Sequence, residues 1–123
     1  MPWSADYLKD EGIILLKSRG ENNLDDYIEQ TRKIAEMVNE RNILEILLDH
    51  SELINKASLT EIYEIPKLYE AHNLNRNVKI AVIVSKDLSQ ELDFEFFEDI
   101  CRNRGWNMKL FRGREPALRW LKS

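Results

Sequence analysis

The sequence predicts one α/β domain over residues 1–123, with a mixed, mostly parallel sheet of four or five strands, an N-terminal hairpin and four helices. Three observations support this prediction. Short runs rich in Ile, Val and Leu alternate with segments whose apolar residues recur at helical spacing. The length of 123 residues suits a single domain. The resulting order, β-β-α-β-α-β-α-β-α, favours right-handed crossovers between parallel strands.

An antiparallel hairpin is predicted at the start of the chain. Residues 3–9 alternate loosely between apolar and polar side chains, and residues 13–17 form a compact apolar run. Residues 9–12, Lys-Asp-Glu-Gly, have the composition of a turn that joins two strands. We expect residues 20–23 to break the chain after this hairpin, because Gly and Asn are common in turns.

The first helix is predicted to begin after Asn23 and to end near residues 41–42. Asn23 is a favourable N-cap, and Asp25 and Asp26 suit the positively polarised first turn. The residues at helical spacing are Leu24, Tyr27, Ile28, Thr31, Ile34, Ala35 and Val38.

Residues 43–48 predict a strand covered on both faces. The run Ile-Leu-Glu-Ile-Leu-Leu is too short for a helix and too apolar for a half-exposed strand. We expect Asp-His-Ser at residues 49–51 to end it.

The second helix is predicted to start at Ser58, because Ser58 and Glu61 have the spacing of a capping box. Pro66 lies within the apolar pattern and cannot donate a backbone hydrogen bond. We therefore expect a kink, or two short helices that meet at Pro66. The expected buried side consists of Leu59, Ile62, Tyr63, Ile65, Leu68 and Tyr69.

Residues 78–84 are the clearest strand, because Val-Lys-Ile-Ala-Val-Ile-Val is rich in β-branched side chains. A third helix is expected from residue 89 or 90 to residue 104, with Gly105 left-handed at its end. Its buried stripe is expected to contain Leu92, Phe96 or Phe97, Ile100 and Cys101.

Residues 106–111 predict a further covered strand, and Gly113 ends it. Pro116 fits the first turn of a final helix, where its missing N–H costs nothing. The inner face of this helix is expected to consist of Ala117, Leu118, Trp120 and Leu121.

The composition excludes several classes of protein. One Cys excludes a disulfide framework and a Cys-based zinc cluster within the chain. The apolar runs are far shorter than a membrane span, and the first residues lack the apolar region of a cleavable signal. There is no phosphate-cradling glycine loop, and the two His lack the paired spacing of metal ligands. We expect no cofactor, no metal, no catalytic set and a cytoplasmic location.

Charge is unevenly distributed along the chain. Residues 102–123 carry seven basic side chains and one acid, whereas the net charge of the whole chain is −4. The basic stretch is interpreted either as an anion or partner site or as a solvated tail. The candidate contacts are Arg102, Asn103, Arg104 and Arg112, which can clamp a carboxylate or phosphate or can complement a helix dipole. The acidic chain disfavours nucleic acid.

Motifs spread over nearly the whole chain carry a family resemblance. They are Leu47-Leu48-Asp49, Ser58-Leu59-x-x-x-Tyr63-Glu64, the run Val78 to Val84, Phe96-Phe97-Glu98-x-x-x-Arg102-Asn103-Arg104-Gly105, Leu110-Phe111 and Ala117-Leu118-x-Trp120-Leu121. With these motifs the chain resembles the STAS domains of bacterial anti-sigma-factor antagonists. It is more similar to the SpoIIAA-like, or STAS/Sec14-like, branch of small bacterial or archaeal domains.

The resemblance implies a candidate phospho-acceptor. In the antagonists a partner kinase phosphorylates a serine at the start of the second helix, and Ser58 matches that position. The acid before the serine and the glycine after it are absent here, where Ala57 and Leu59 stand instead. The alternative is that Ser58 serves only as a helix cap.

Five further residues are candidates for a pocket or an interface. His50 follows a predicted strand end, where open α/β sheets often bind ligands. The chain also has more aromatic side chains than one small core usually needs. The candidate set is His50, Tyr63, Tyr69, Phe96 and Phe97.

Two functions follow as hypotheses. The first is a non-enzymatic regulatory domain that works through protein–protein contacts as a homodimer, with its contact surface on the second helix and the loop of residues 51–58. The second is a carrier of a small apolar ligand or lipid, as the Sec14-like resemblance implies, with a pocket between helices and sheet. An enzyme would need a convergent set of groups that one sequence does not reveal.

Overall fold

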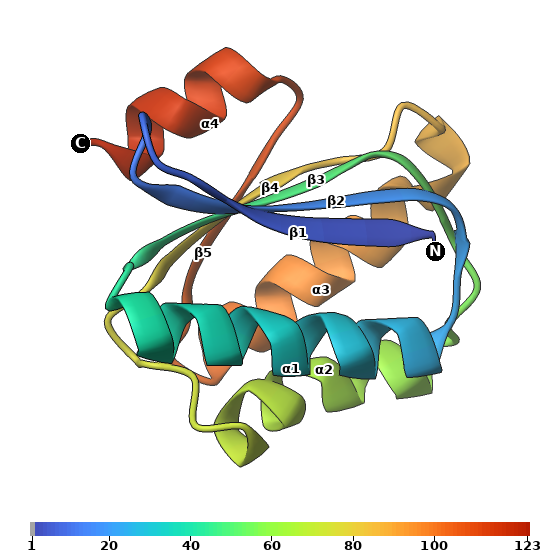
Figure 1. Ribbon diagram of the computed structural model, residues 1–123. Helices are drawn as coiled ribbons and strands as arrows, with labels where there is room; N and C mark the ends of the chain where they lie inside the picture. Colours follow the sequence, from blue (N-terminus) through green and yellow to red (C-terminus); the bar gives the residue numbers. More distant parts are fainter. Residues whose placement is uncertain (1) are drawn as a thin grey trace.

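The computed structural model describes residues 2–123 as a five-stranded sheet with helices on both faces (Figure 1). The strands follow the order β1-β2-β3-β4-β5; β1 and β2 are antiparallel, and the other neighbours are parallel. The predicted fold class and element order are confirmed. The strands are β1 (Trp3–Leu8), β2 (Ile13–Asn22), β3 (Glu45–Asn55), β4 (Lys79–Ile83) and β5 (Asn107–Phe111). The helices are α1 (Leu24–Arg41), α2 (Leu59–Ala71), the 3₁₀ turn η1 (Leu88–Gln90), α3 (Glu91–Asn103) and α4 (Arg114–Leu121).

The strand order decides which face each helix covers. Each parallel crossover moves one strand further in the same direction, so right-handed connections place α1, α2 and α3 on the same face. The last helix, α4, packs on the opposite face (Figure 1). Alternate strand residues therefore enter two separate hydrophobic layers. The smaller layer, beneath α4, contains Ile13, Leu47, Ala81, Ile83, Ala117 and Leu121.

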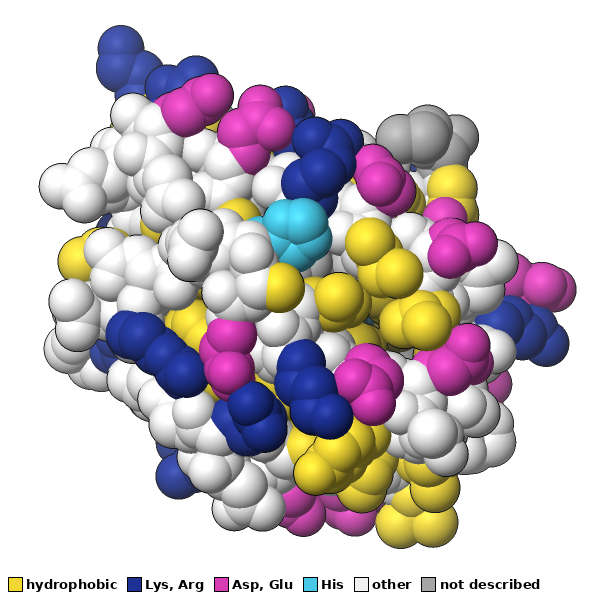
Figure 2. All heavy atoms as spheres, turned by 90° about the horizontal axis from the view of Figure 1, so that it is seen from below, with side chains coloured by type: hydrophobic (Ala, Val, Ile, Leu, Met, Phe, Trp, Pro, Cys, Tyr) yellow, Lys and Arg dark blue, Asp and Glu magenta, His cyan; other side chains and the backbone are white. Residues whose placement is uncertain are grey.

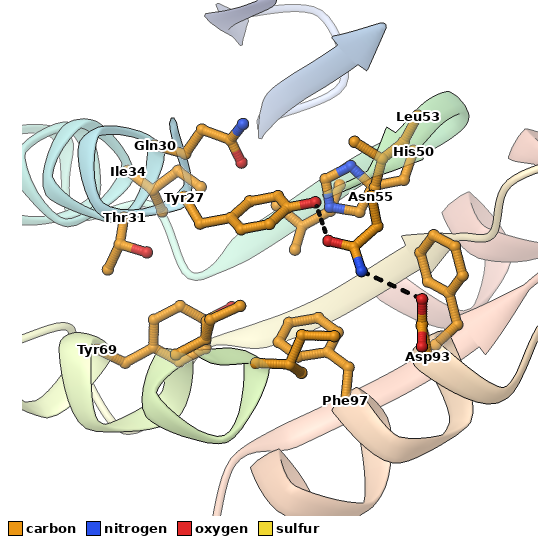
Figure 3. A pocket seen from close by; sticks show the side chains of 14 residues that line it. Tyr27, Gln30, Thr31, Ile34, His50, Leu53, Asn55, Tyr69, Asp93 and Phe97 are labelled. Atoms are coloured by element: carbon orange, nitrogen blue, oxygen red, sulfur yellow. Dashed lines mark hydrogen bonds between the residues drawn. The ribbon is translucent and has the colours of Figure 1, made fainter. Parts of the chain in front are cut away.

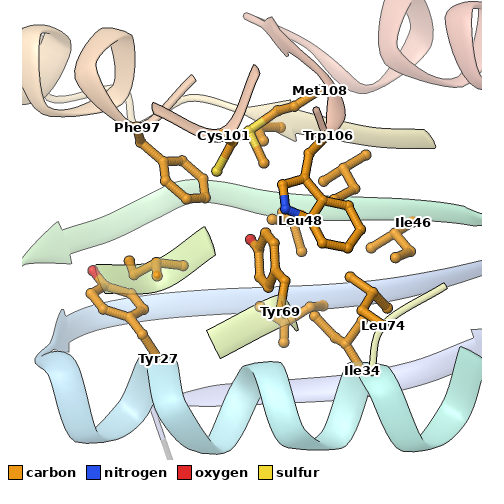
Figure 4. Close-up of a cluster of buried hydrophobic side chains, with 14 of the residues drawn as sticks. Tyr27, Ile34, Ile46, Leu48, Tyr69, Leu74, Phe97, Cys101, Trp106 and Met108 are labelled. Carbon is orange, nitrogen blue, oxygen red and sulfur yellow. The ribbon is translucent and has the colours of Figure 1, made fainter. Parts of the chain in front are cut away.

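The larger hydrophobic layer lies between the sheet and the three helices (Figure 4). Trp106, the residue before β5, is 2% exposed and meets the ring of Tyr69 edge-on at 5.4 Å between centroids. The guanidinium of Arg76 covers the Trp106 ring at 4.2 Å. Trp106, next to β5, thus contacts both α2 and the loop before β4.

Local signals in the sequence place the helix ends. Asn23 and Ser58 both form complete capping boxes, with Asp26 and Glu61 as the reciprocal partners. Gly105 follows α3 with φ of 90°, the left-handed conformation predicted for it.

The predicted end of β3 is wrong. The strand continues through residues 49–51 to Asn55, and β2 likewise continues through Gly20 to Asn22. Between the pairs Lys17↔Asp49 and Arg19↔Glu52, β3 advances one residue more than β2. This extra residue is a β-bulge within Asp49–Glu52, so the polar residues that suggested a strand end mark an irregularity inside the strand.

Pro66 does not divide α2. One α-helix runs from Leu59 to Ala71, so the predicted pair of short helices is wrong. Pro66 itself is buried, and α2 packs against α1 and α3. Packing of this kind offsets the backbone hydrogen bond that proline cannot donate.

Three predicted burial patterns are also wrong. Leu59 and Tyr63, which were expected on the buried side of the second helix, are 53% and 47% exposed. Leu92 is 76% exposed, and Phe94 is buried in its place beside Phe97. The strand β5 is an edge strand with Asn107 and Lys109 exposed, so it is not covered on both faces.

Candidate functional site

A cavity of about 60 Å³ lies between α1, α2, α3 and the sheet (Figure 3). Its wall is mostly aliphatic and aromatic, with several polar groups. The polar groups come from different elements: Tyr27, Gln30 and Thr31 from α1, His50 and Asn55 from β3, and Asp93 from α3. The cavity lies where the carrier hypothesis expects a pocket. It is far smaller than the roughly 300–1,000 Å³ of pockets that enclose drug-sized ligands.

The bulge in β3 sets the floor of this cavity. Up to the bulge, the even-numbered residues Ile46 and Leu48 face the three helices and His50 lines the cavity. Beyond the extra residue the phase changes, and Leu53 and Asn55 face the cavity instead. A strand without the bulge would turn Leu53 and Asn55 to the other face of the sheet.

Asn55 links three segments at the polar end of the cavity. Its Oδ1 accepts hydrogen bonds from the Tyr27 hydroxyl and the Ala57 N–H, both at 2.9 Å. Its Nδ2 donates to Asp93 at 3.1 Å (Figure 3) and to the Ala57 carbonyl. Its own N–H donates to the side chain of Gln90. These contacts hold the starts of α2 and α3 against the end of β3.

His50 is the unusual group in the wall. It is 5% exposed, and its ring lies 6.1 Å from that of Phe94. Its Nδ1 is buried and has no hydrogen-bond partner among residues 2–123. Burial lowers the pKa of the imidazole from 6.5 to about 4, although the carboxylate of Asp49 opposes this shift. His50 is therefore neutral at physiological pH.

Two buried tyrosines and the buried cysteine are also held in their neutral forms. Burial raises the pKa values of Tyr27 and Tyr69 well above their usual value of 10.0. Burial likewise raises the pKa of the Cys101 thiol, which disfavours the reactive thiolate. The chemistry that this arrangement supports is hydrogen bonding to a neutral group.

The structure separates the five candidate pocket or interface residues. His50, Tyr69 and Phe97 line the cavity. Tyr63 lies outside it on the exposed side of α2, and Phe96 is half-buried without lining it. The two adjacent phenylalanines therefore face different surroundings.

Ser58 lies at the exposed start of α2. Its Oγ accepts a hydrogen bond from the Glu61 N–H at 3.1 Å, and the Glu61 carboxylate accepts from the Ser58 N–H at 2.9 Å. Phosphorylation of Ser58 stays a prediction. A phosphate there would lie beside the Glu61 carboxylate, which would repel it.

The cap itself gives a direct prediction. Ser58→Ala is expected to lower the free energy of unfolding by about 1 kcal/mol, because the Glu61 N–H loses its acceptor. Urea unfolding measures this change, with Thr60→Ala at the exposed neighbouring position as the control. Equal effects of the two substitutions would contradict the capping role.

The candidate anion contacts are not brought together. The guanidinium of Arg104 forms two hydrogen bonds of 2.8 Å with Glu70, whose pKa it lowers. Arg112 pairs with Glu91 at 2.9 Å, and Arg102 donates to the Met108 carbonyl. Asn103 is exposed at the end of α3. Arg104 and Arg112 thus pair with acids distant in sequence, whereas Arg102 bonds to a backbone carbonyl.

A second hollow of about 360 Å³ lies near the carboxyl ends of β4 and β5. Leu88, Phe94, Leu110 and Phe111 form much of its wall, and the Glu91–Arg112 ion pair lies at its side. No described group of three or more His, Cys, Asp or Glu residues is arranged to hold a metal ion. None of the helices between residues 2 and 123 has the length and hydropathy that crossing a bilayer needs.

Large hydrophobic side chains are exposed where α2 and α3 begin. Leu59 is 53% and Tyr63 47% exposed, one turn apart on α2, and Leu92 is 76% exposed on the neighbouring α3. We call these three residues the α2–α3 patch. Figure 2 shows hydrophobic side chains gathered among charged ones on this helical side of the molecule. The helix α3 carries five acids and one arginine. On α2, the ammonium of Lys67 lies 4.9 Å from the centre of the Tyr63 ring and pairs with Glu64, so the acidic side of the patch is the α3 side.

Sequence reasoning missed Tyr27, Asn55 and Asp93 as members of one site. They lie on three different elements and share no motif. The only signal near them is the polar sequence Asn55-Lys56 at the end of an apolar strand.

The comparison with solved structures identifies the fold. An uncharacterised protein of the DUF3478 family from Shewanella loihica PV-4, described as having a SpoIIAA-like fold, matches with a TM-score of 0.59 and 22% identity over 97% of this chain and 91% of that chain. The chain thus has a SpoIIAA-like fold, as its motifs suggest.

Two further structures also match. The unphosphorylated anti-sigma factor antagonist SpoIIAA has a TM-score of 0.48 and 16% identity over 84% of this chain and 98% of that chain. The phosphorylated Bacillus cell fate determinant SpoIIAA has a TM-score of 0.47 and 13% identity over 96% and 97%. No protein-family model and no curated protein matches the sequence.

Proposed function

We propose that this chain is a non-enzymatic regulatory domain that acts by binding another protein through the α2–α3 patch. The observation that carries the proposal is the exposure of Leu59, Tyr63 and Leu92 on two adjacent helices. When a partner covers exposed apolar groups of this size, they are removed from water, and the free energy of the complex is lowered.

The surroundings of the patch define the partner's chemistry. Glu95 is exposed and α3 is acidic along its length, whereas Glu64 on α2 already pairs with Lys67. The partner surface is therefore expected to present an apolar anchor with Lys or Arg side chains on the side that faces α3. Charge complementarity of this kind speeds association and selects the orientation of binding.

The proposed contact surface overlaps in part with the surface that the sequence-based hypothesis names. That hypothesis placed the contact on the second helix and the preceding loop, and Leu59 and Tyr63 lie there. The contribution of α3 through Leu92 is new. The homodimer and the cytoplasmic location stay predictions.

Substitution of the patch tests the proposal. Leu59→Ser with Leu92→Ser is expected to weaken binding of the protein partner about tenfold or more, because buried apolar anchors supply most of the energy of an interface. The measurement is recovery of the partner with the tagged chain from its source cells, followed by titration of the purified partner.

The control is Leu44→Ser, which removes another exposed leucine ahead of β3, away from the starts of α2 and α3. Binding should survive this change. Equal binding by all three proteins, or equal loss in the control, would overturn the proposal. Sedimentation of the purified chain separately tests the homodimer.

A further inference from the structure

We propose that the cavity between α1, α2, α3 and the sheet binds a small neutral molecule with an apolar body and one hydroxyl group, which hydrogen bonds to His50. This inference does not depend on the protein-binding role of the α2–α3 patch. It assigns a ligand site and a ligand class to the interior of the same domain.

The first argument is the unpartnered imidazole. The Nδ1 atom of His50 is buried without a hydrogen-bond partner among the described residues, and His50 lines the cavity. A buried polar atom left unpaired is costly, and native structures rarely leave one. Trp106 Nε1 is also unpaired, but Trp106 does not line the cavity.

The second argument is the division of the cavity wall. Figure 3 shows Tyr27, His50 and Asn55 near one another at one end, with Ile34, Tyr69 and Phe97 along the sides. The Tyr27 hydroxyl already donates a hydrogen bond to the Asn55 side chain, which in turn donates one to Asp93. At this end of the cavity, the buried atom without a hydrogen-bond partner is therefore Nδ1 of His50.

A hydroxyl group suits His50 in either neutral tautomer. If Nδ1 lacks a proton, the ligand hydroxyl donates to it; if Nδ1 carries the proton, the hydroxyl oxygen accepts. A ligand with a ketone oxygen or an ether oxygen satisfies only the second case.

The charges in the wall select a neutral ligand. No Lys or Arg lines the cavity among the described residues, and the one carboxylate, Asp93, accepts a hydrogen bond from Asn55. An anion would enter the cavity without a counterion, and no interaction there would compensate the free energy lost with its hydration shell.

The volume limits the size of the ligand. At about 60 Å³, the cavity is far smaller than pockets that enclose drug-sized ligands, so only a molecule of a few non-hydrogen atoms suits it. An acyl chain of a lipid does not fit this space. Short alcohols such as 2-propanol have the required size, shape and hydroxyl group.

The experiment titrates the ¹³C-methyl-labelled chain with 2-propanol and follows NMR shifts of the cavity methyl groups of Leu48, Leu53, Ile62 and Ile65. Saturable shifts are expected with a dissociation constant of about 1–10 mM, because so small a ligand offers few contacts. The ¹⁵N shift of His50 Nδ1 is expected to move along the same curve.

Two variants distinguish the contribution of the His50 hydrogen bond to binding from the contribution of the cavity volume. His50→Leu is expected to weaken 2-propanol binding about tenfold while xenon, an apolar probe, still binds the cavity. His72→Leu makes the same change outside the cavity and is expected to bind 2-propanol like the original chain. Thermal unfolding confirms that each variant is folded.

Three outcomes would overturn the inference: shifts in the unmodified chain that rise linearly without saturation, equal 2-propanol binding by His50→Leu, or a cavity that retains only water. The first outcome needs no variant, so the proposal can fail even if His50→Leu does not fold. None of these outcomes affects the test of the α2–α3 patch.

Discussion

Lowering the pH from 7 to 4 is expected to reduce the free energy of unfolding by about 3 kcal/mol through His50 alone. The pKa of His50 is lowered from 6.5 to about 4 in the folded chain, chiefly by burial. Between these two values the unfolded chain takes up a proton that the folded chain does not. Stability is therefore lost as the pH falls through this window, and His50 adds no pH dependence above it.

Urea unfolding at pH 7, 5 and 4 measures this effect. The carboxylates also titrate in acid, so the informative quantity is the difference between the unmodified chain and His50→Leu. His72→Leu is the matched control and should keep the full pH dependence. If His50→Leu lost as much stability between pH 7 and pH 4 as the unmodified chain, the buried imidazole would not be the cause.

Trp106→Ala is expected to lower the free energy of unfolding by about 3–5 kcal/mol, the largest effect that we predict for a single side chain. The residue is 2% exposed, and its ring contacts Tyr69 and Arg76. Removing it opens a void between α2, α3 and β5. Chemical denaturation at pH 7 measures the loss.

Trp106→Phe is the matched variant. It keeps an aromatic ring in the cluster and removes the indole N–H, which is buried without a partner. Its cost is expected to be much smaller, about 1 kcal/mol, because only part of the buried surface is lost. Equal costs for the two substitutions would contradict the view that ring packing makes Trp106 important.

The order of elements was predictable because each signal is local. Capping residues such as Asn23 and Ser58 satisfy N–H groups within the next turn, so their effect can be seen in a few neighbouring residues. The run that contains β4 can likewise be recognised as a strand from its own β-branched residues. Gly105 ends α3 because few other residues adopt its backbone conformation at low cost.

The errors arise where tertiary contacts override local preference. The polar residues Asp49 and Ser51 suggested a strand end, but pairing with β2 continues through a bulge. Packing of α2 against its neighbours keeps the helix whole at Pro66. The burial of Phe94 rather than Leu92 depends on how α3 rotates against the sheet, which the sequence leaves undetermined.

The candidate site was harder to predict than the fold. His50, Tyr69 and Phe97 were candidates, but their shared cavity also needs Tyr27, Asn55 and Asp93 from separate elements. The sequence alone left open whether the basic C-terminal stretch forms one patch. Arg104 and Arg112 pair with Glu70 and Glu91, acids that only folding brings close to them.

Site-specific photocrosslinking in the source cells tests the central claim, protein binding through the α2–α3 patch, most directly. A photoreactive residue is placed at position 92, and the control chain carries it at position 44, an exposed leucine away from the patch. We predict a discrete crosslinked protein from position 92 and none from position 44. The same crosslinks from both positions, or none from position 92, would contradict the account.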